Sequence, residues 1–386
     1  MLERISSTIG VDVVRRWPSI PPLPTMRNKS ALPRMPMRHA PLAFLLALSG
    51  SIATAAPESH EGLFYQHLDW VVACDNTRTC RAAGHSGSSD SPLSVLLTRK
   101  GGPDQVIEGR LALQPDKGQA QPKGLLNLRI QKQDLGALTP DAVAGMYSMS
   151  ATQTRALLSA LVRDGGIKVT DTTGQRWTLS DKGAAAVLLK IDEYQGRLGT
   201  PGAMLRTGSS PEAGVLVAQP ATVIRQASTL DSTRDDAALT RIAASVELRA
   251  ALLATPKGPH CEGLLEANLD PSISNSPLKV RRLDAVHLLV SVPCWHAAHN
   301  DGVGYWVIRE QPPFQPSWVT NDAYHYENGQ IVAYRRELGP VECTFEYTWT
   351  WNGARFIGTS AVRGVMCGPH ALDGAWKLPT LVSEIR

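Results

Sequence analysis

The stretch Leu68-Asp69-Trp70-Val71-Val72-Ala73-Cys74-Asp75-Asn76-Thr77-Arg78-Thr79-Cys80 is the best guide to how this chain is built. A large aromatic residue, Trp70, and Cys74 fall on the same side of a pattern with a period of two, which predicts a strand with both side chains on one face. Asp75-Asn76 is typical of a turn, and Cys80 follows six positions after Cys74. We therefore predict a small hairpin that a disulfide bond closes.

The six cysteines of the chain all lie after residue 73. They are Cys74, Cys80, Cys261, Cys294, Cys343 and Cys367. An even number downstream of an export signal predicts three disulfide bonds, although spacing alone leaves many connectivities open. We favour pairing of sequence neighbours, 74–80, 261–294 and 343–367, because each bond then stays within a local unit. The alternative is a set of buried free thiols.

The first 55 residues differ from the rest of the chain. Residues 1–36 show no sustained periodicity and are interpreted as disordered or as preceding the true start. Residues 37–55 combine Arg38, a short apolar run and the small-residue sequence Ala53-Thr54-Ala55, which is typical of a cleaved secretory signal peptide. The apolar run is too short for a membrane span, so we predict no span after cleavage.

The charge of the chain excludes one class of partner. Residues 1–55 hold seven Lys or Arg and two acidic residues, which leaves 32 basic and 33 acidic residues after them. The basic character of the whole chain therefore belongs to its leader. The remainder has no electrostatic footprint for nucleic acid.

Residues 62–200 predict an antiparallel β-rich domain with two helices. Short apolar runs lie between Gly, Pro and Asp clusters, as expected for strands. Ser150 begins a capping box for a helix that ends at Gly165-Gly166. A hairpin over Ile167–Leu179 follows, and we expect Ser180 to cap a second helix. Residues 201–231 are rich in Gly, Pro, Ser and Thr and are interpreted as a linker.

Residues 232–386 predict an entry helix followed by an antiparallel sheet. The helix should run from about Arg234 to Ala254, with Ser232 as its cap. Two Asn-Gly pairs, Asn328-Gly329 and Asn352-Gly353, each lie between alternating runs and predict hairpins. The fold class is therefore α+β and mostly β, with two antiparallel β-rich domains, accessory helices and disulfide bonds.

Three separated motifs resemble a bacterial family of exported proteins classed as a domain of unknown function. They are Asp69-Trp70 through Cys80, Asp192-Glu193-Tyr194-Gln195-Gly196-Arg197, and Arg282-Leu283-Asp284 through Trp295 with Gly304-Tyr305-Trp306. The front half is more weakly similar to proteins of the invasion-associated locus B type, through Trp70-x-x-x-Cys74 and through the stretch from Leu179 to Ala186 with Gly183. The resemblance implies a periplasmic location and a β-rich build, and it implies no reaction.

Asp192, Gln195 and Arg197 are the candidate polar pocket. They fall at the end of an alanine-rich helix, where they could bind a ligand or line an interface with the sheet. The alternative is a structural network, in which Asp192 pairs with an arginine and Gln195 caps backbone groups.

Other chemical motifs are weak. Cys294-x-His296-x-x-His299 has donor atoms at short spacing, but a metal role would take Cys294 from its disulfide bond. Gly84-His85-Ser86-Gly87-Ser88 is no nucleophile elbow, and Ser276-Pro277-Leu278-Lys279 lacks its companion motifs. We assign no catalytic residue, no metal ligand and no cofactor.

Aromatic residues are concentrated near the carboxyl end, where six of the nine tryptophans follow residue 294. The set that needs an explanation is Trp295, Tyr305, Trp306, Trp318, Tyr324, Tyr326, Trp349, Trp351 and Trp376. They could fill a core or form an exposed platform for a sugar or peptide.

The leading hypothesis is a periplasmic, non-catalytic binding protein for an envelope glycan or a protein partner. The alternatives are an envelope-associated hydrolase and a structural or stress-linked protein.

Overall fold

The computed structural model describes residues 61–386 apart from 88–91, 116–120, 164, 231–236, 267–271, 338–342 and 368–373. All of these residues belong to one compact unit, 56–386. The expected leader, including the signal peptide at 37–55, lies outside the described residues. None of the described helices is long and apolar enough to cross a membrane.

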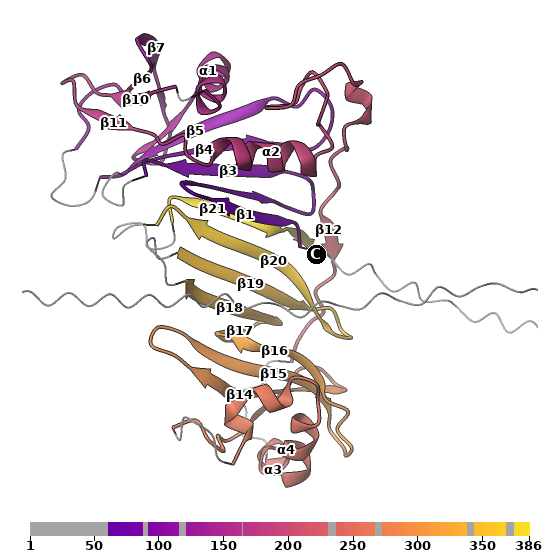
Figure 1. The fold of residues 1–386 in the computed structure, drawn as a ribbon. Coiled ribbons are helices and arrows are strands. Elements are labelled where there is room, and N and C mark those ends of the chain that lie inside the picture. The colour runs from indigo at the N-terminus through magenta and orange to yellow at the C-terminus, as the bar shows by residue number, and fades with distance from the viewer. Residues whose placement is uncertain are drawn as a thin grey trace, which may run out of the picture. The chain divides into compact units, whose positions relative to one another are not determined.

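A seven-stranded antiparallel sheet, which we call the front sheet because it contains the first strands of the chain, lies in the upper half of Figure 1 and has the order β1-β2-β3-β4-β5-β9-β8. Its strands are β1 (Leu63–His67), β2 (Trp70–Cys74), β3 (Cys80–His85), β4 (Leu93–Arg99), β5 (Ile107–Leu113), β8 (Thr139–Pro140) and β9 (Met146–Ser148). The predicted hairpin is the β2–β3 pair, in which Cys74 lies opposite Cys80.

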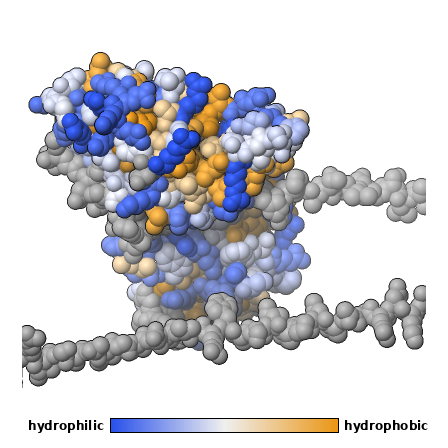
Figure 2. All heavy atoms as spheres, turned by 45° about the horizontal axis from the view of Figure 1, so that its top comes forward, coloured by the Kyte–Doolittle hydropathy of each residue, from blue (hydrophilic) through white to orange (hydrophobic). Residues whose placement is uncertain are grey.

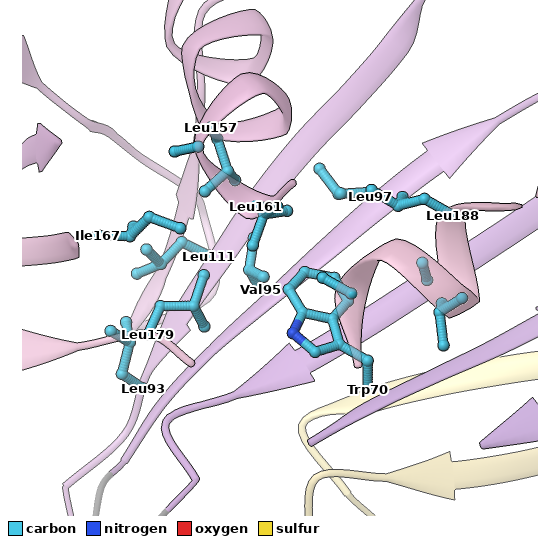
Figure 3. Packing of buried hydrophobic residues seen from close by; sticks show 14 of the residues in the cluster. Trp70, Leu93, Val95, Leu97, Leu111, Leu157, Leu161, Ile167, Leu179 and Leu188 are labelled. Carbon is cyan, nitrogen blue, oxygen red and sulfur yellow. The ribbon is translucent and has the colours of Figure 1, made fainter. Parts of the chain in front are cut away.

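A smaller antiparallel sheet and two helices cover one face of this sheet. The small sheet has the order β11-β10-β6-β7, from β6 (Asn127–Ile130), β7 (Gln133–Ala137), β10 (Ile167–Thr170) and β11 (Arg176–Thr178). Helix α1 (Ala151–Leu161) contacts β5, β6 and β10, and α2 (Ala184–Tyr194) contacts β1, β2 and β3. Figure 3 shows how Trp70 and leucines from both helices and the sheet fill the core between these layers. Figure 2 shows hydrophobic side chains reaching the surface of this helix-bearing side.

The two helices begin in different ways. The predicted capping box of α1 is present, because Ser150 accepts a bond from the Gln153 amide while the Gln153 side chain accepts one from Ser150. The prediction that Ser180 caps α2 was wrong, because the N-cap residue of α2 is Gly183, whose φ is 94°. Ser180 instead donates to the carboxylate of Asp69, which ties the turn before α2 to β2.

Two further antiparallel sheets, which we call the back sheets, contain the later strands of the chain. One has the order β13-β14-β15-β16, from β13 (Lys279–Arg282), β14 (His287–His296), β15 (Asp301–Arg309) and β16 (Ser317–Ala323). The other has the order β17-β18-β19-β20-β21, from β17 (His325–Glu327), β18 (Gln330–Glu337), β19 (Cys343–Trp351), β20 (Phe356–Val365) and β21 (Trp376–Leu381).

The expected entry helix is two helices. Helix α3 (Ala237–Ala243) ends before Ser245, whose side chain caps α4 (Val246–Leu253) by accepting a bond from the Leu248 amide. The expected cap Ser232 lies outside the described residues. Two short turns follow, η2 (Gly258–His260) and η3 (Glu262–Leu264). Both helices and η3 supply residues to a core that includes residues of β14 and β15.

Both Asn-Gly pairs form hairpins, but with different turns. Asn328 and Gly329 are the only residues between β17 and β18, and both have positive φ, as a tight two-residue turn requires. The second turn is longer, since β20 starts only at Phe356 and the Asn352 side chain accepts bonds from Ala354 and Arg355.

The segment expected to be a linker makes specific contacts. It contains η1 (Glu212–Gly214) and β12 (Thr222–Ile224), and β12 pairs in parallel with β22 (Ser383–Ile385). All other strand pairs among the described residues are antiparallel, which confirms the mostly β, antiparallel fold class. The division into two domains at this segment stays a prediction.

The front sheet and the last sheet share a core. Val71, Ala73 and Ala83 on the second face of the front sheet pack with Trp376 and Leu378 of β21. The Trp376 indole donates to the Ser94 hydroxyl at 3.0 Å. Figure 1 shows β21 next to β1, and the Gly62 amide donates to the Thr380 carbonyl at this edge.

Two of the predicted disulfide bonds are present, Cys74–Cys80 and Cys261–Cys294. Cys367 is also disulfide-bonded, and none of the described cysteines is free. The pairing of 343 with 367 stays a prediction, because the side chain at 343 is outside the described set.

Asn76 joins the front hairpin to the carboxyl-terminal strands. Its side-chain nitrogen donates to the Val382 carbonyl at 3.0 Å, and its side-chain oxygen accepts from the Val382 amide at 2.8 Å. We expect Asn76→Ala to lower the free energy of unfolding by about 1–3 kcal/mol, since both backbone groups of Val382 lose this partner. Urea denaturation measures the difference. Asn76→Asp keeps only the acceptor and should lie between the two; equal stability of all three proteins would contradict this role.

Candidate functional site

The three residues of the candidate polar pocket are brought together, and all are fully buried. Asp192 lies in the last turn of α2, Gln195 follows that helix, and Gly196 has a φ of 69° that turns the chain toward Arg197. The Gln195 oxygen accepts a bond from Arg197 Nε at 2.8 Å. The motif thus places a carboxylate, an amide and a guanidinium at the same helix end.

The side chains of Asp192, Gln195 and Arg197 form hydrogen bonds with backbone groups of neighbouring segments. Gln195 Nε2 donates to the carbonyls of Arg78 and Arg99, at 2.8 and 3.0 Å. Arg197 Nη2 donates to the Gly102 carbonyl at 2.6 Å. The Asp192 carboxylate accepts from the amides of Met204 and Leu205, at 2.8 and 3.1 Å. The alternative of a helix-end network therefore describes most of these contacts.

Two charged residues that the sequence did not point to complete the cluster. Arg99 Nη1 donates to the Gly202 carbonyl at 2.7 Å, and the Gly202 amide donates to Glu212 Oε1 at 2.5 Å. Glu212 Oε2 lies 3.7 Å from Arg197 Nη1. Arg99 and Glu212 lie far from the motif in sequence and belong to no pattern of their own, so only the folded chain shows their role.

The cluster balances two carboxylates against two guanidinium groups in a buried setting. Burial raises the pKa of Asp192, because it disfavours the charged carboxylate. Burial and the nearby Arg197 lower the pKa of Arg99 to about 10. Among the described side chains, Asp192 Oδ1, Arg197 Nη1 and Glu212 Oε2 are buried without a hydrogen-bond partner. Glu212 thus reaches the solvent in part, while these three atoms are buried and their hydrogen bonding is incomplete.

The Asp-Trp motif is also structural. The Trp70 indole donates to the Ser180 carbonyl at 2.9 Å, and a Cβ atom at Gly84 would lie 2.2 Å from the indole ring. Asp75 Oδ1 accepts from the amide and hydroxyl of Thr77, while the Tyr194 hydroxyl donates to the Asp75 carbonyl at 3.1 Å. The first and second motifs are therefore in direct contact.

Residues of the third motif, from Arg282 to Trp306, also make structural contacts. The Asp284 carboxylate accepts from the backbone amide of His287 and contacts its ring at 2.9 Å, which closes the turn before β14. A Cβ atom at Gly304 would lie 2.4 Å from Cys294 Sγ, so glycine makes room for the disulfide bond. The Trp306 indole donates to the Thr255 hydroxyl at 3.1 Å.

Residues of two weaker motifs, Cys294-x-His296-x-x-His299 and Ser276-Pro277-Leu278-Lys279, make structural contacts. Cys294 is in a disulfide bond, and His296 is paired with Asp301 at the surface. The described residues contain no group of three or more His, Cys, Asp or Glu side chains that could hold a metal ion. The Ser276 hydroxyl donates to the Ile273 carbonyl at 2.6 Å.

The nine aromatic residues divide between core and surface. Tyr305, Trp306, Tyr326, Trp351 and Trp376 are buried. Trp295 and Trp349 are half-buried, while Trp318 and Tyr324 are 38% and 62% exposed. The core interpretation thus holds for the first five, and the others reach the surface.

A row of three half-buried rings follows β19, and we call Phe345, Tyr347 and Trp349 the aromatic row. Adjacent centroids are 6.4 and 4.4 Å apart. The alternation of this strand was expected from the sequence, but the face of Thr344, Thr348 and Thr350 is the more buried one.

Both ends of the aromatic row are anchored. At one end the Arg363 guanidinium lies 4.5 Å from the ring centre of Phe345 and 4.6 Å from that of Phe64 on β1. At the other end Trp349 packs against the core between the two back sheets. A Cβ atom at Gly358 would lie 2.1 Å from the Tyr347 hydroxyl oxygen, so glycine is required beneath the central ring.

The fold and these sites define a disulfide-stabilised, β-rich protein whose sequence motifs connect its sheets. Residues 64–383 match the family described as "Protein of unknown function (DUF1176)", and the chain belongs to this family. It is 24% identical over 364 residues to the uncharacterized protein YpfG of Escherichia coli (strain K12), an alignment that covers 87% of this chain and 97% of that protein. No solved structure matches the chain significantly.

We expect Asp192→Ala to reduce stability by about 1–3 kcal/mol, because it leaves the backbone amides of Met204 and Leu205 without their acceptor. Chemical denaturation of the purified protein measures this change. Glu193→Ala is the matched control, since the adjacent Glu193 is exposed and forms only a surface pair with Lys190. A similar loss in both variants would show that Asp192 has no special role.

The raised pKa of Asp192 has a pH signature. The folded state favours the protonated carboxyl group of Asp192. This contribution to the free energy of unfolding is fully present below the ordinary pKa of an aspartate and is lost as pH rises through the raised pKa. The neutral variant Asp192→Asn lacks this loss, so its stability relative to the natural protein should improve as pH rises across that interval. Parallel unfolding profiles of the two proteins from acid to neutral pH would contradict it.

Proposed function

We propose that the protein is a non-catalytic periplasmic binding protein and that the aromatic row receives an envelope glycan. The observation that supports this is the row itself: three adjacent rings on one strand that remain partly open to solvent. Such rings in a β-sheet usually complete a core. Here the buried face of the strand carries threonines, while the three rings are half-buried and Trp349 packs against a neighbouring core.

Aromatic rings suit a sugar for a physical reason. The face of an aromatic ring is electron-rich, so it attracts the C–H groups on the face of a sugar ring while both lose contact with water. The Arg363 guanidinium group stacks on Phe345 and holds this ring of the row in place. Rigid rings bind with a smaller loss of conformational entropy than flexible side chains.

The periplasmic part of the proposal is supported by the disulfide bonds. Bonds such as Cys74–Cys80 and Cys261–Cys294 persist in oxidising compartments and are rare in the cytosol. The signal peptide predicted for residues 37–55 and the weak similarity of the front half to invasion-associated locus B type proteins agree with export. Envelope hydrolysis and a structural or stress-linked role remain the competing functions.

The test is co-sedimentation of the mature protein with purified peptidoglycan sacculi. We expect the natural protein to sediment and the double variant Tyr347→Ala/Trp349→Ala to lose at least about tenfold in affinity, since two stacking contacts are removed. Trp318→Ala is the matched control because Trp318 is exposed but lies outside the row. Circular dichroism and thermal unfolding confirm that each variant is folded.

Two outcomes would contradict the proposal. If the natural protein does not sediment with the sacculi, it does not bind this glycan. Release of soluble sugar fragments by the natural protein would show a hydrolase instead of a binding protein.

A further inference from the structure

The buried cluster at the end of α2 resembles a carboxylate-binding site whose present occupant is part of the chain itself. Glu212 Oε1 accepts the Gly202 amide at 2.5 Å, and Oε2 lies 3.7 Å from Arg197 Nη1. A Cβ atom at Gly202 would lie 2.4 Å from Glu212 Oε1 and 3.3 Å from Arg99 Nη2. Gly202 therefore lets a carboxylate approach both a backbone amide and a guanidinium.

The groups that surround this carboxylate are rigidly held. Arg197 is fully buried and fixed by the Gln195 side chain and the Gly102 carbonyl. Arg99 is 6% exposed and is held by the carbonyls of Gln105 and Gly202. Donors that other contacts hold in place bind an anion without reorganising, which is the property of a preformed site.

The occupant is held less firmly than its site. The Glu212 side chain is 21% exposed, and Ser209, Ser210, Pro211 and Ala213 around it are all exposed. Its Oε2 atom and Arg197 Nη1 are both buried without a hydrogen-bond partner, although they face each other. The pair is too long for a hydrogen bond, so Arg197 retains donor capacity that a freely positioned carboxylate could use.

We propose that Arg99, Arg197 and the Gly202 amide form a binding site for an external carboxylate, and that Glu212 occupies this site and competes with the ligand. The ligand class follows from the resident group: a small carboxylate, or the carboxylate of a peptide terminus or acidic sugar. Asp192 belongs to the site as the fixed negative charge that keeps the two guanidinium groups together when Glu212 leaves. This site is separate from the aromatic row and does not depend on the glycan proposal.

Chemical rescue in the mature, disulfide-bonded protein tests the proposal, with acetate as the probe. Glu212→Ala removes the resident carboxylate and should lower Tm, and acetate at constant ionic strength should restore it in a saturable manner. Acetamide, which has nearly the same shape but no charge, should have no effect. Glu193→Ala, which removes an exposed carboxylate on α2, should show no acetate response.

The natural protein provides the second measurement. Because Glu212 must leave first, acetate should bind it with an affinity at least about tenfold weaker than it binds Glu212→Ala, as measured by NMR shifts of the Gly202 amide. Failure of acetate to stabilise Glu212→Ala overturns the site. Rescue of the variant without any acetate binding to the natural protein overturns the exchange, because Glu212 would then be a permanent structural group.

Discussion

Backbone amides and carbonyls that are buried in loops must find hydrogen-bond partners, and this need determines how the sheets of the protein are joined. Strand pairing satisfies these groups within each sheet, but it cannot satisfy the loops where sheets and helices meet. Here side chains take that role. Asn76 pairs with both backbone groups of Val382, and Gln195 donates to the carbonyl of Arg78 in the β2–β3 turn and to that of Arg99 at the end of β4. Several of the motif residues that carry the family resemblance, among them Trp70, Asp192 and Asp284, make contacts of this kind.

This explains why the sequence motifs do not by themselves identify a function. Asp192, Gln195 and Arg197 have the residue types of a binding pocket, yet their main contacts are with loop backbone. The aromatic row, by contrast, lies outside the three motifs. The same residue types can therefore bond the backbone of the fold or bind a ligand, and the sequence alone does not tell these roles apart. The burial and the hydrogen-bond partners of each side chain distinguish them.

Much of the local structure could be predicted from the sequence, because short-range rules determine it. The capping box at Ser150, the hairpin at Asn328-Gly329 and the disulfide-closed turn after Trp70 each depend on residues within a few positions of one another. Interactions between distant residues could not be predicted. Ser180 has the chemistry of a helix cap, but the Asp69 carboxylate binds it instead, and Arg99 and Glu212 reach the polar cluster only through the tertiary fold.

The parallel pairing of β12 with β22 bears on how the chain acquires its structure. A protein is made from its amino end, so residues 222–224 and the turn at Asn76 both exist long before residues 382–385 that complete them. Until those residues arrive, the middle segment and the front hairpin lack their last partners. The native state is therefore reached only after the whole chain is present, which makes its assembly a late, long-range event dominated by loop closure.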